Sequence, residues 1–252
     1  MKNLVFLSSK KFLYLTCFFV MGALLTGCGQ KEKPRVLVFS KTKGFYHESI
    51  PTGIAAIQKL GAENDFIVDT TKDATRFTSD SLKKYKAVIF LSTTGDVLDA
   101  DQQAAFEHYI ESGRGFVGIH AAADTEYDWP WYNKLVGAYF KSHPGNPNVR
   151  KAVVNVVNKE HPATRGLPDK WERTDEWYNY KSINPDMTVL AKLDEKSYEG
   201  GENGDNHPIM WCHKYDSGRA FYTGGGHTKE SYEEPLFLQH LLGGIQYVLG
   251  ED

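Results

Sequence analysis

Three histidines of this 252-residue chain stand at or just after the ends of short apolar runs, each beside glycine or other small residues. His47 lies in the segment KGFYHE, His120 in GIHAA and His227 in TGGGHT. Imidazole changes its charge near neutral pH, so it can accept or release a proton under physiological conditions. Its neutral form is also a common ligand of zinc and similar ions. The three histidines therefore indicate a site for acid–base catalysis or for a divalent metal.

A fourth histidine and a carboxylate extend this candidate site: His143, in the segment SHP, and Glu176, in DEWY. A carboxylate can bind a metal directly or orient a neighbouring imidazole. The chain has no H-E-x-x-H or C-x-x-C signature, but ligands drawn from separate loops leave no such signature. The predicted catalytic residues are His47, His120, His227 and Glu176. The predicted ligands of a divalent metal such as zinc are His47, His120, His143 and His227.

Aromatic side chains are dense in residues 127–132 and 171–180, and the second segment also holds two adjacent acids that suit the edge of a sugar site. Sugars present apolar C–H faces that pack against such rings, although core packing explains most single rings. Asp124 follows the second of the histidines closely, whereas we expect Glu126 and Asp128 to lie in a solvated loop. The candidate substrate-binding residues are Tyr46, Asp124, Trp129, Trp177 and Tyr178.

Two kinds of catalytic or binding motif are disfavoured. His120 occupies the strand exit where a nucleophile elbow would hold serine or cysteine, and the chain has no G-x-S-x-G motif, so acyl transfer is disfavoured. Cys212 lies in a strand-like run, which predicts a buried and inert thiol. The glycines of TGGGHT could cradle an anion with their amides but lack the lysine of a P-loop, so nucleotide binding is unsupported.

The pattern of apolar runs predicts how these residues are positioned. Continuous apolar runs of strand length alternate with helical spacing in the first half, which is typical of parallel βαβ units. We expect strands at 35–40, 66–70, 86–92 and 115–120, with helices at 48–60 and 99–112. The later half is less regular and loop-rich between 124 and 207, with a helix at 129–136, strands at 151–157, 188–193, 208–214 and 219–223, and a closing helix at 235–249.

The predicted fold class is therefore α/β, a doubly wound and mostly parallel sheet of the flavodoxin-like type. In an open parallel sheet, ligands bind at the carboxyl ends of the strands. His47, His120 and His227 are all predicted to lie at that edge, with His143 reaching in from the later half and Glu176 standing beside one of the imidazoles.

The N-terminal residues have the pattern of a secretory signal peptide. Lys2, Lys10 and Lys11 precede an apolar run over residues 12–25, which ends in LTGC. A basic start followed by a run this short is typical of a secretory signal, and the small pair before the cysteine resembles the bacterial lipobox. We expect a signal peptide over 1–27, lipid on Cys28, a tether over 28–34, and attachment to the membrane at the cell envelope, on its periplasmic face or the cell surface.

Charge argues against nucleic acid as a partner. The chain holds 29 Lys and Arg against 32 Asp and Glu, and removal of 1–27 takes away three bases and no acid, which leaves a net charge of −6. A general nucleic-acid binder needs a basic face to displace counterions.

Several short motifs in combination resemble the ThuA-like (trehalose utilisation) family. These motifs are GFYH at 44–47, GRGFVGIH at 113–120, SHP at 142–144, HPATRGL at 161–167, DEWY at 175–178, and a segment running from GR at 218–219 to GHT at 226–228. The resemblance covers residues 35–250 and implies one domain with the class I glutamine amidotransferase-like fold. It also implies a link to disaccharide utilisation and the absence of the amidotransferase cysteine. His120 agrees with that absence, so a glutaminase is disfavoured.

These observations favour a lipid-anchored, carbohydrate-active enzyme that acts on a disaccharide, glycoside or keto-sugar derivative by histidine acid–base chemistry, with or without a metal. The reaction stays open between hydrolysis or elimination of a glycosidic bond and isomerisation of a keto-sugar. The alternative is a non-catalytic carbohydrate-binding lipoprotein, which would use the aromatic residues but would not need several histidines. In both cases the partner is a small carbohydrate.

Overall fold

The computed structural model describes Met1 and residues 32–251. Apart from Met1, the predicted signal peptide lies outside the described residues, as does Cys28, so signal cleavage and lipid attachment stay predictions. Within the part of the chain that is described, no helix is both long and apolar enough to span a bilayer.

Five parallel strands form the first half of a nine-stranded sheet. They are, in their spatial order, β2 (Ile67–Thr71), β1 (Arg35–Phe39), β3 (Ala87–Leu91), β4 (Gly115–Ile119) and β11 (Gly218–Thr223). This order is the 2-1-3-4-5 arrangement of flavodoxin-like doubly wound folds. All residues of β3 and β4 are buried, as expected of strands covered by helices on both faces. The predicted fold class is confirmed.

The sheet continues beyond β11 as an antiparallel extension. Its strands are β10 (Pro208–Tyr215), β9 (Thr188–Asp194), β6 (Val149–Val156) and β7 (Lys170–Glu176). A separate two-stranded sheet pairs β5 (Tyr139–Ser142) with β8 (Asn179–Lys181). The pattern did not predict β5, β7 or β8, which lie in the segment expected to be rich in loops. Because each neighbour in the extension reverses direction, β7 runs in the same sense as β11.

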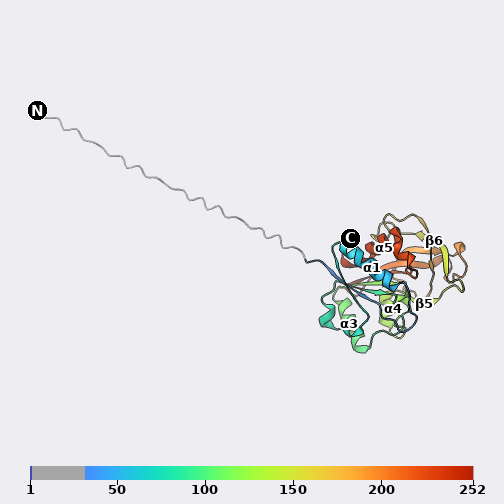
Figure 1. Cartoon of the computed structure of the whole chain (residues 1–252), viewed down its shortest axis with the longest axis horizontal. Helices are drawn as coiled ribbons and strands as arrows, with labels where there is room; N and C mark the ends of the chain where they lie inside the picture. The colour runs from blue at the N-terminus through green and yellow to red at the C-terminus, as the bar shows by residue number, and fades with distance from the viewer. Residues whose placement is uncertain (2–31, 252) are drawn as a thin grey trace. The chain divides into compact units, whose positions relative to one another are not determined.

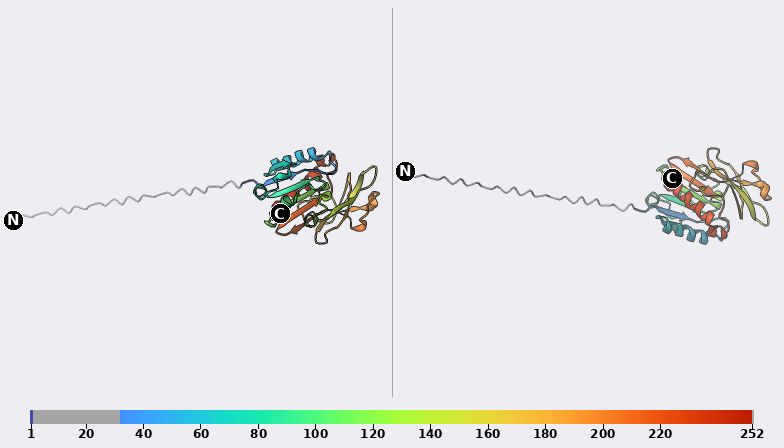
Figure 2. Two further views of the ribbon diagram at one scale, coloured as in Figure 1. Left: turned by 90° about the horizontal axis from the view of Figure 1, so that it is seen from below. Right: turned by 90° about the horizontal axis from the view of Figure 1, so that it is seen from above.

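Helices cover both faces of the parallel half (Figures 1 and 2). They are α1 (Ile50–Glu63), α2 (Ser79–Leu82), α3 (Ala100–Glu111), α4 (Pro130–Val136) and α5 (Pro235–Leu249). The first and last, α1 and α5, contact each other on one face, while α3 and α4 lie on the other. Asp99 caps α3 in a capping box with Gln102, so this helix begins where its sequence predicted.

A buried histidine on α5 makes the domain sensitive to acid. His240 has no exposed surface, its ring lies among Phe221, Phe237 and Trp171, and its Nδ1 donates to the Ala163 carbonyl at 2.8 Å. Burial lowers the pKa of His240 to about 3, against 6.5 for a free imidazole. Between pH 6.5 and pH 3, His240 is therefore protonated in the unfolded chain but not in the folded chain. This difference favours the unfolded chain, so the stability present above pH 6.5 is lost as the pH falls towards 3.

Between pH 6.5 and pH 3, we expect His240 to lower the free energy of unfolding of the wild type by about 1.4 kcal/mol for each pH unit of acidification. In His240→Leu the fall between pH 6.5 and pH 4 should be smaller, because one of the proton-binding groups is gone. Urea unfolding at a series of pH values measures both slopes. The matched control is His108→Leu, which changes an exposed imidazole on α3. Equal slopes in wild type and His240→Leu would contradict the assignment.

Candidate functional site

Four side chains from four separate segments converge at the carboxyl edge of the parallel strands. His47 follows β1, His120 follows β4, His227 follows β11, and Glu176 ends β7. One ligand atom from each residue lies within 4.8 Å of the other three. His47, His120 and Glu176 are buried, while the side chain of His227 is 17% exposed. We call these four residues the His–Glu cluster.

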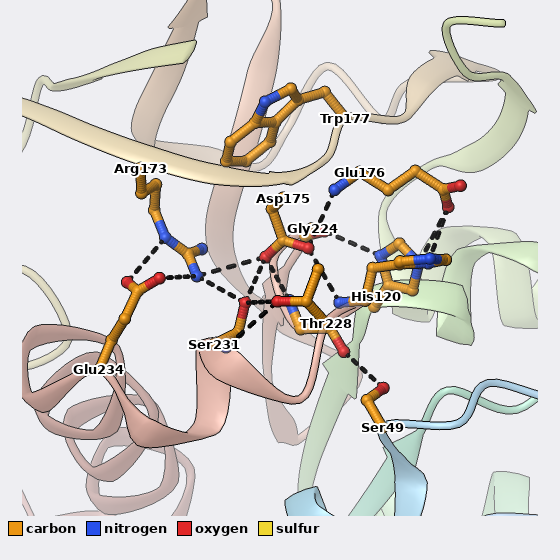
Figure 3. A network of polar contacts seen from close by, with 12 residues as sticks. Ser49, His120, Arg173, Asp175, Glu176, Trp177, Gly224, Thr228, Ser231 and Glu234 are labelled. Carbon is orange, nitrogen blue, oxygen red and sulfur yellow. Dashed lines mark hydrogen bonds and ion pairs between the residues drawn. The ribbon is translucent and has the colours of Figure 1, made fainter. Parts of the chain in front are cut away.

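Glu176 reaches the cluster only because the sheet coils. Adjacent strands lie about 4.8 Å apart, so in a flat sheet β7, four places from β11, would lie roughly 19 Å away from it. Direct hydrogen bonds nevertheless join the end of β7 to the loop after β11 (Figure 3). The antiparallel extension therefore curls back over the carboxyl edge and brings its last residues against the histidines.

Asp175 fixes this contact. Its carboxylate is fully buried and accepts from the backbone amides of Gly226 at 2.8 Å and His227 at 3.0 Å, and from the Ser231 hydroxyl at 2.8 Å. The Arg173 guanidinium lies 3.2 Å away on the other side. The glycine-rich turn thus does cradle an anion, but the anion is Asp175 of the same chain. Asp175 positions His227, and it does not form a sugar-binding edge.

The backbone around His120 is unusual. His120 has a φ of +50°, a left-handed conformation that is uncommon for residues other than glycine, although histidine adopts it more often than most. The Tyr222 hydroxyl donates to the His120 carbonyl at 2.7 Å and holds it in place. A Cβ on Gly118 would lie 2.9 Å from the Tyr222 ring, so a glycine two residues before His120 leaves room for the ring that holds this turn. Such strain is typical of a residue held for its function.

The polar atoms of three cluster residues form a close triangle. His120 Nε2 lies 3.1 Å from His227 Nδ1 and 3.3 Å from Glu176 Oε2, and His227 Nδ1 lies 3.1 Å from the same oxygen. The other His120 nitrogen, Nδ1, donates to the Gly224 carbonyl at 3.0 Å. The His47 ring stands edge-on to both other imidazoles, with centroids 4.8 and 5.1 Å away.

Burial and mutual proximity shift the pKa values in the cluster. Burial, helped by the nearby imidazoles His120 and His227, lowers the pKa of His47 to about 2. Burial opposes ionisation of Glu176, but the two imidazoles beside it outweigh that effect and hold the pKa of its carboxyl below the ordinary value. Burial likewise opposes the charge on His227, yet Glu176 outweighs it and raises the pKa of that imidazole.

His143 lies outside the cluster. Its Nε2 is 3.7 Å from Glu176 Oε1, and its Nδ1 donates to the Pro144 carbonyl at 2.8 Å. His143 follows β5 in the small sheet, so it reaches the outer oxygen of Glu176 and does not reach the other histidines. The place predicted for a fourth imidazole is taken by the carboxylate. The same outer oxygen accepts from the Asn148 amide, a contact that the sequence did not suggest.

Three predicted substrate-binding residues lie near the cluster. The Tyr178 ring packs against the His120 ring with centroids 4.3 Å apart. Asp124 ends the short turn that His120 begins, is half-buried, and accepts from the Tyr127 hydroxyl at 2.6 Å. Tyr46, next to His47, is 39% exposed.

The two predicted tryptophans belong to the core instead. Trp129 is buried, stacks on Trp131 and donates its indole N–H to Glu107 at 2.9 Å. Trp177 is also buried and donates to the Arg150 carbonyl, and Figure 3 shows its indole on the Arg173 side while the Glu176 carboxylate points toward His120. Both large apolar rings are excluded from water by packing, so neither has a face for a sugar.

Two further expectations concern single residues outside the cluster. Glu126 was expected in a solvated loop but is buried, and its carboxylate accepts from the backbone amides of Val97 and Leu98 and from Gln103, each at 2.8 Å. Cys212 is a buried free thiol whose pKa burial raises to about 11, so it is poorly suited to act as a nucleophile.

Phe45 is, besides Asn148, a residue beside the cluster that the sequence reasoning missed. It is 64% exposed, and its ring meets the His47 ring edge-on with centroids 4.9 Å apart. Together Phe45 and Tyr46 place two exposed aromatic rings directly before His47 in the chain. The signal was present in the segment KGFYHE, but a single exposed aromatic cannot be told from a core residue by pattern alone.

Comparison with known proteins agrees with this fold. The sequence matches the ThuA family, described as trehalose utilisation, over residues 35–248. The structure of a ThuA-like protein from Bacteroides uniformis ATCC 8492 is similar, with 26% identity and a TM-score of 0.74 over 87% of this chain and 92% of that one. A ThuA-like protein from Parabacteroides merdae ATCC 43184 gives 20% identity and 0.68 over 87% and 91%.

A β-galactosidase from Bacillus circulans sp. alkalophilus shares the fold alone, with 14% identity and a TM-score of 0.56 over 86% of this chain and 31% of that enzyme. No functionally curated protein matches the sequence. The family match spans nearly the whole described domain, including β1, β4, β7 and β11, which carry the cluster. The chain therefore belongs to the ThuA family of trehalose utilisation.

Proposed function

We propose that this chain is a carbohydrate-active enzyme whose reaction takes place at the His–Glu cluster. The observation that carries the proposal is the convergence of three imidazoles and one carboxylate, from four segments, at the edge where doubly wound folds bind ligands. Burying such groups together costs free energy, and they are not required for packing. Perturbed ionisable groups gathered in this way are typical of active sites.

Carbohydrate as the substrate class is supported by two observations. The family is described by trehalose utilisation. Phe45 and Tyr46 present exposed aromatic rings beside His47, where the apolar face of a sugar ring can pack. The exposed imidazole of His143 lies 3.7 Å from Glu176 Oε1, where it can bind a sugar hydroxyl or carry a proton.

The cluster favours keto-sugar chemistry over a two-carboxylate glycosidase. A glycosidase of that kind needs two carboxylates across the scissile bond, but Glu176 is the single carboxylate in the described cluster. A keto group makes the neighbouring C–H acidic, so elimination or isomerisation needs one base and one group that polarises the carbonyl. The cluster can supply these either as imidazoles that exchange protons or through an ion that they hold.

The test is a substrate panel. The purified chain is incubated with trehalose, other disaccharides and their 3-keto forms, and products are identified by liquid chromatography with mass spectrometry. We expect turnover of a keto-sugar. We expect His120→Asn to lower the rate at least about 100-fold, because asparagine tolerates the left-handed backbone but cannot replace the imidazole.

The matched control is His108→Asn, which changes an exposed histidine and should leave the rate unchanged. Sugar binding by calorimetry with no product from any member of the panel would favour the alternative, a carbohydrate-binding protein without catalysis. Full turnover in a folded His120→Asn variant would place the reaction elsewhere.

A further inference from the structure

We infer that His47, His120, His227 and Glu176 bind one divalent transition-metal ion of the zinc type. Metal binding stands on the geometry of the cluster alone. Only its use in catalysis rests on the proposed function, since an ion held there would polarise the carbonyl of a keto-sugar.

The spacing of the donor atoms fits a shared ion. The triangle of His120 Nε2, His227 Nδ1 and Glu176 Oε2 has edges of 3.1, 3.1 and 3.3 Å. In a tetrahedral site with ligand distances of about 2.0–2.1 Å, neighbouring donor atoms lie about 3.3–3.4 Å apart. His47 offers a fourth donor within 4.8 Å of the other three. The triangle therefore has the compactness of a site for one small ion, and His47 is the candidate fourth ligand.

The hydrogen bonds around the triangle leave lone pairs facing one another. The Gly224 carbonyl can only accept, so His120 Nδ1 carries a proton and Nε2 is the ring nitrogen that can offer a lone pair to an ion. Glu176 Oε2, 3.3 Å away, also presents only lone pairs. A single proton on His227 Nδ1 cannot point along both of these contacts at full strength. One cation at the centre satisfies all three donor atoms at once.

Outer contacts orient the ligands as they do in metal sites. The Gly224 carbonyl fixes the tautomer and direction of His120, and the Asn148 amide holds the second oxygen of Glu176. Asp175 fixes the backbone of His227. In addition, His47 Nδ1 is buried and has no hydrogen-bond partner among the described residues, so protein contacts leave this ring less constrained than the others.

The donor types select the class of ion. Three imidazoles with one carboxylate suit zinc and its first-row neighbours, whereas Mg²⁺ and Ca²⁺ prefer sites built from oxygen. Irving–Williams order places Zn²⁺ and Co²⁺ within the same set of ions, which allows Co²⁺ to serve as a spectroscopic probe.

The test measures ion binding without any sugar. The full chain is stripped with a chelator and titrated with ZnCl2 by calorimetry and with CoCl2 by visible absorption. We expect one ion per chain, weaker binding of Mg²⁺ and Ca²⁺, and a rise in melting temperature on adding Zn²⁺. Glu176→Gln should weaken Zn²⁺ binding at least about 100-fold, and Asn148→Ala about 10- to 100-fold, because Asn148 acts through Glu176.

The matched control removes an exposed His–Glu pair, His108 and Glu111, whose atoms lie 2.9 Å apart on α3. The double variant His108→Ala/Glu111→Gln should bind Zn²⁺ as the wild type does. Circular dichroism shows whether each variant is folded. If Glu176→Gln does not fold, the zinc affinity of Asn148→Ala, a change at a half-buried position, tests the metal site instead. Absence of saturable binding near one ion per chain, or unchanged binding in Asn148→Ala and Glu176→Gln, would overturn the inference. Zinc binding without turnover would instead reject the proposed enzyme and leave the metal site standing.

Discussion

Glu176→Gln is expected to lower kcat/KM for the sugar substrate about 1,000-fold. Glutamine keeps the size of the side chain but removes the negative charge that faces His120 and His227 at 3.3 and 3.1 Å. Its amide nitrogen would also present hydrogens to atoms that need an anion or a metal ligand. Steady-state kinetics on the substrate found in the panel measures the loss.

The control for this variant is Glu111→Gln, which neutralises an exposed carboxylate that likewise contacts a histidine. Its kcat/KM should match that of the wild type. A glutamine fits the same space, so Glu176→Gln should fold. Its melting temperature should lie below that of the metal-free wild type, because the favourable contacts of the carboxylate with the two imidazoles are lost. A loss of less than tenfold in kcat/KM would show that Glu176 is not part of the reacting site.

Asp175→Ala is expected to reduce the free energy of unfolding by about 3–5 kcal/mol. The change leaves the buried Arg173 without its buried counter-charge, although Arg173 keeps its contact with Glu234. It also leaves the amides of Gly226 and His227 without acceptors. Removing one partner of a buried ion pair strands the other charge away from water, which is why the expected effect is large. Urea unfolding measures it.

Asp169→Ala serves as the control, because Asp169 also pairs with a cation, Lys159, but lies on the surface with its side chain 80% exposed. An exposed pair contributes at most about 1 kcal/mol, so this variant should differ little from the wild type. A change in Asp175→Ala no larger than that in Asp169→Ala would refute the role of Asp175 as the buried anchor of the loop after β11.

Adjacent acids in β7 thus have separate roles. Successive side chains of a strand point to opposite faces, so Asp175 and Glu176 cannot serve the same site. Asp175 points into the network with Arg173 and Ser231, and Glu176 points to the histidines (Figure 3). We therefore expect the two variants to differ in kind: one mainly unfolds the domain, and the other mainly abolishes turnover.

The sequence by itself predicted the parallel half of the fold and named all four cluster residues, with Glu176 expected beside one of the imidazoles. Continuous apolar runs such as β3 and β4 signal strands that are buried on both faces, and the carboxyl ends of parallel strands meet at one edge. Local pattern and topology therefore sufficed to predict that His47, His120 and His227 lie together. The capping residue Asp99 and the closing helix α5 were predicted for the same reason, since their signals are local.

Only the tertiary structure decided that Glu176, and not His143, completes the cluster with these histidines. Strand β7 escaped prediction because its inward residues Arg173 and Asp175 neutralise each other, which removes the apolar alternation that marks a half-buried strand. The coiling of the four antiparallel strands then selects Glu176 and keeps His143 outside the cluster. That choice depends on contacts such as those of Asp175 with the loop after β11, whose residues lie 51 and 52 positions away. The burial of Trp129 and Trp177 likewise involves partners 22 and 27 positions away. No spacing in the sequence encodes such contacts, because they arise from how the whole sheet packs.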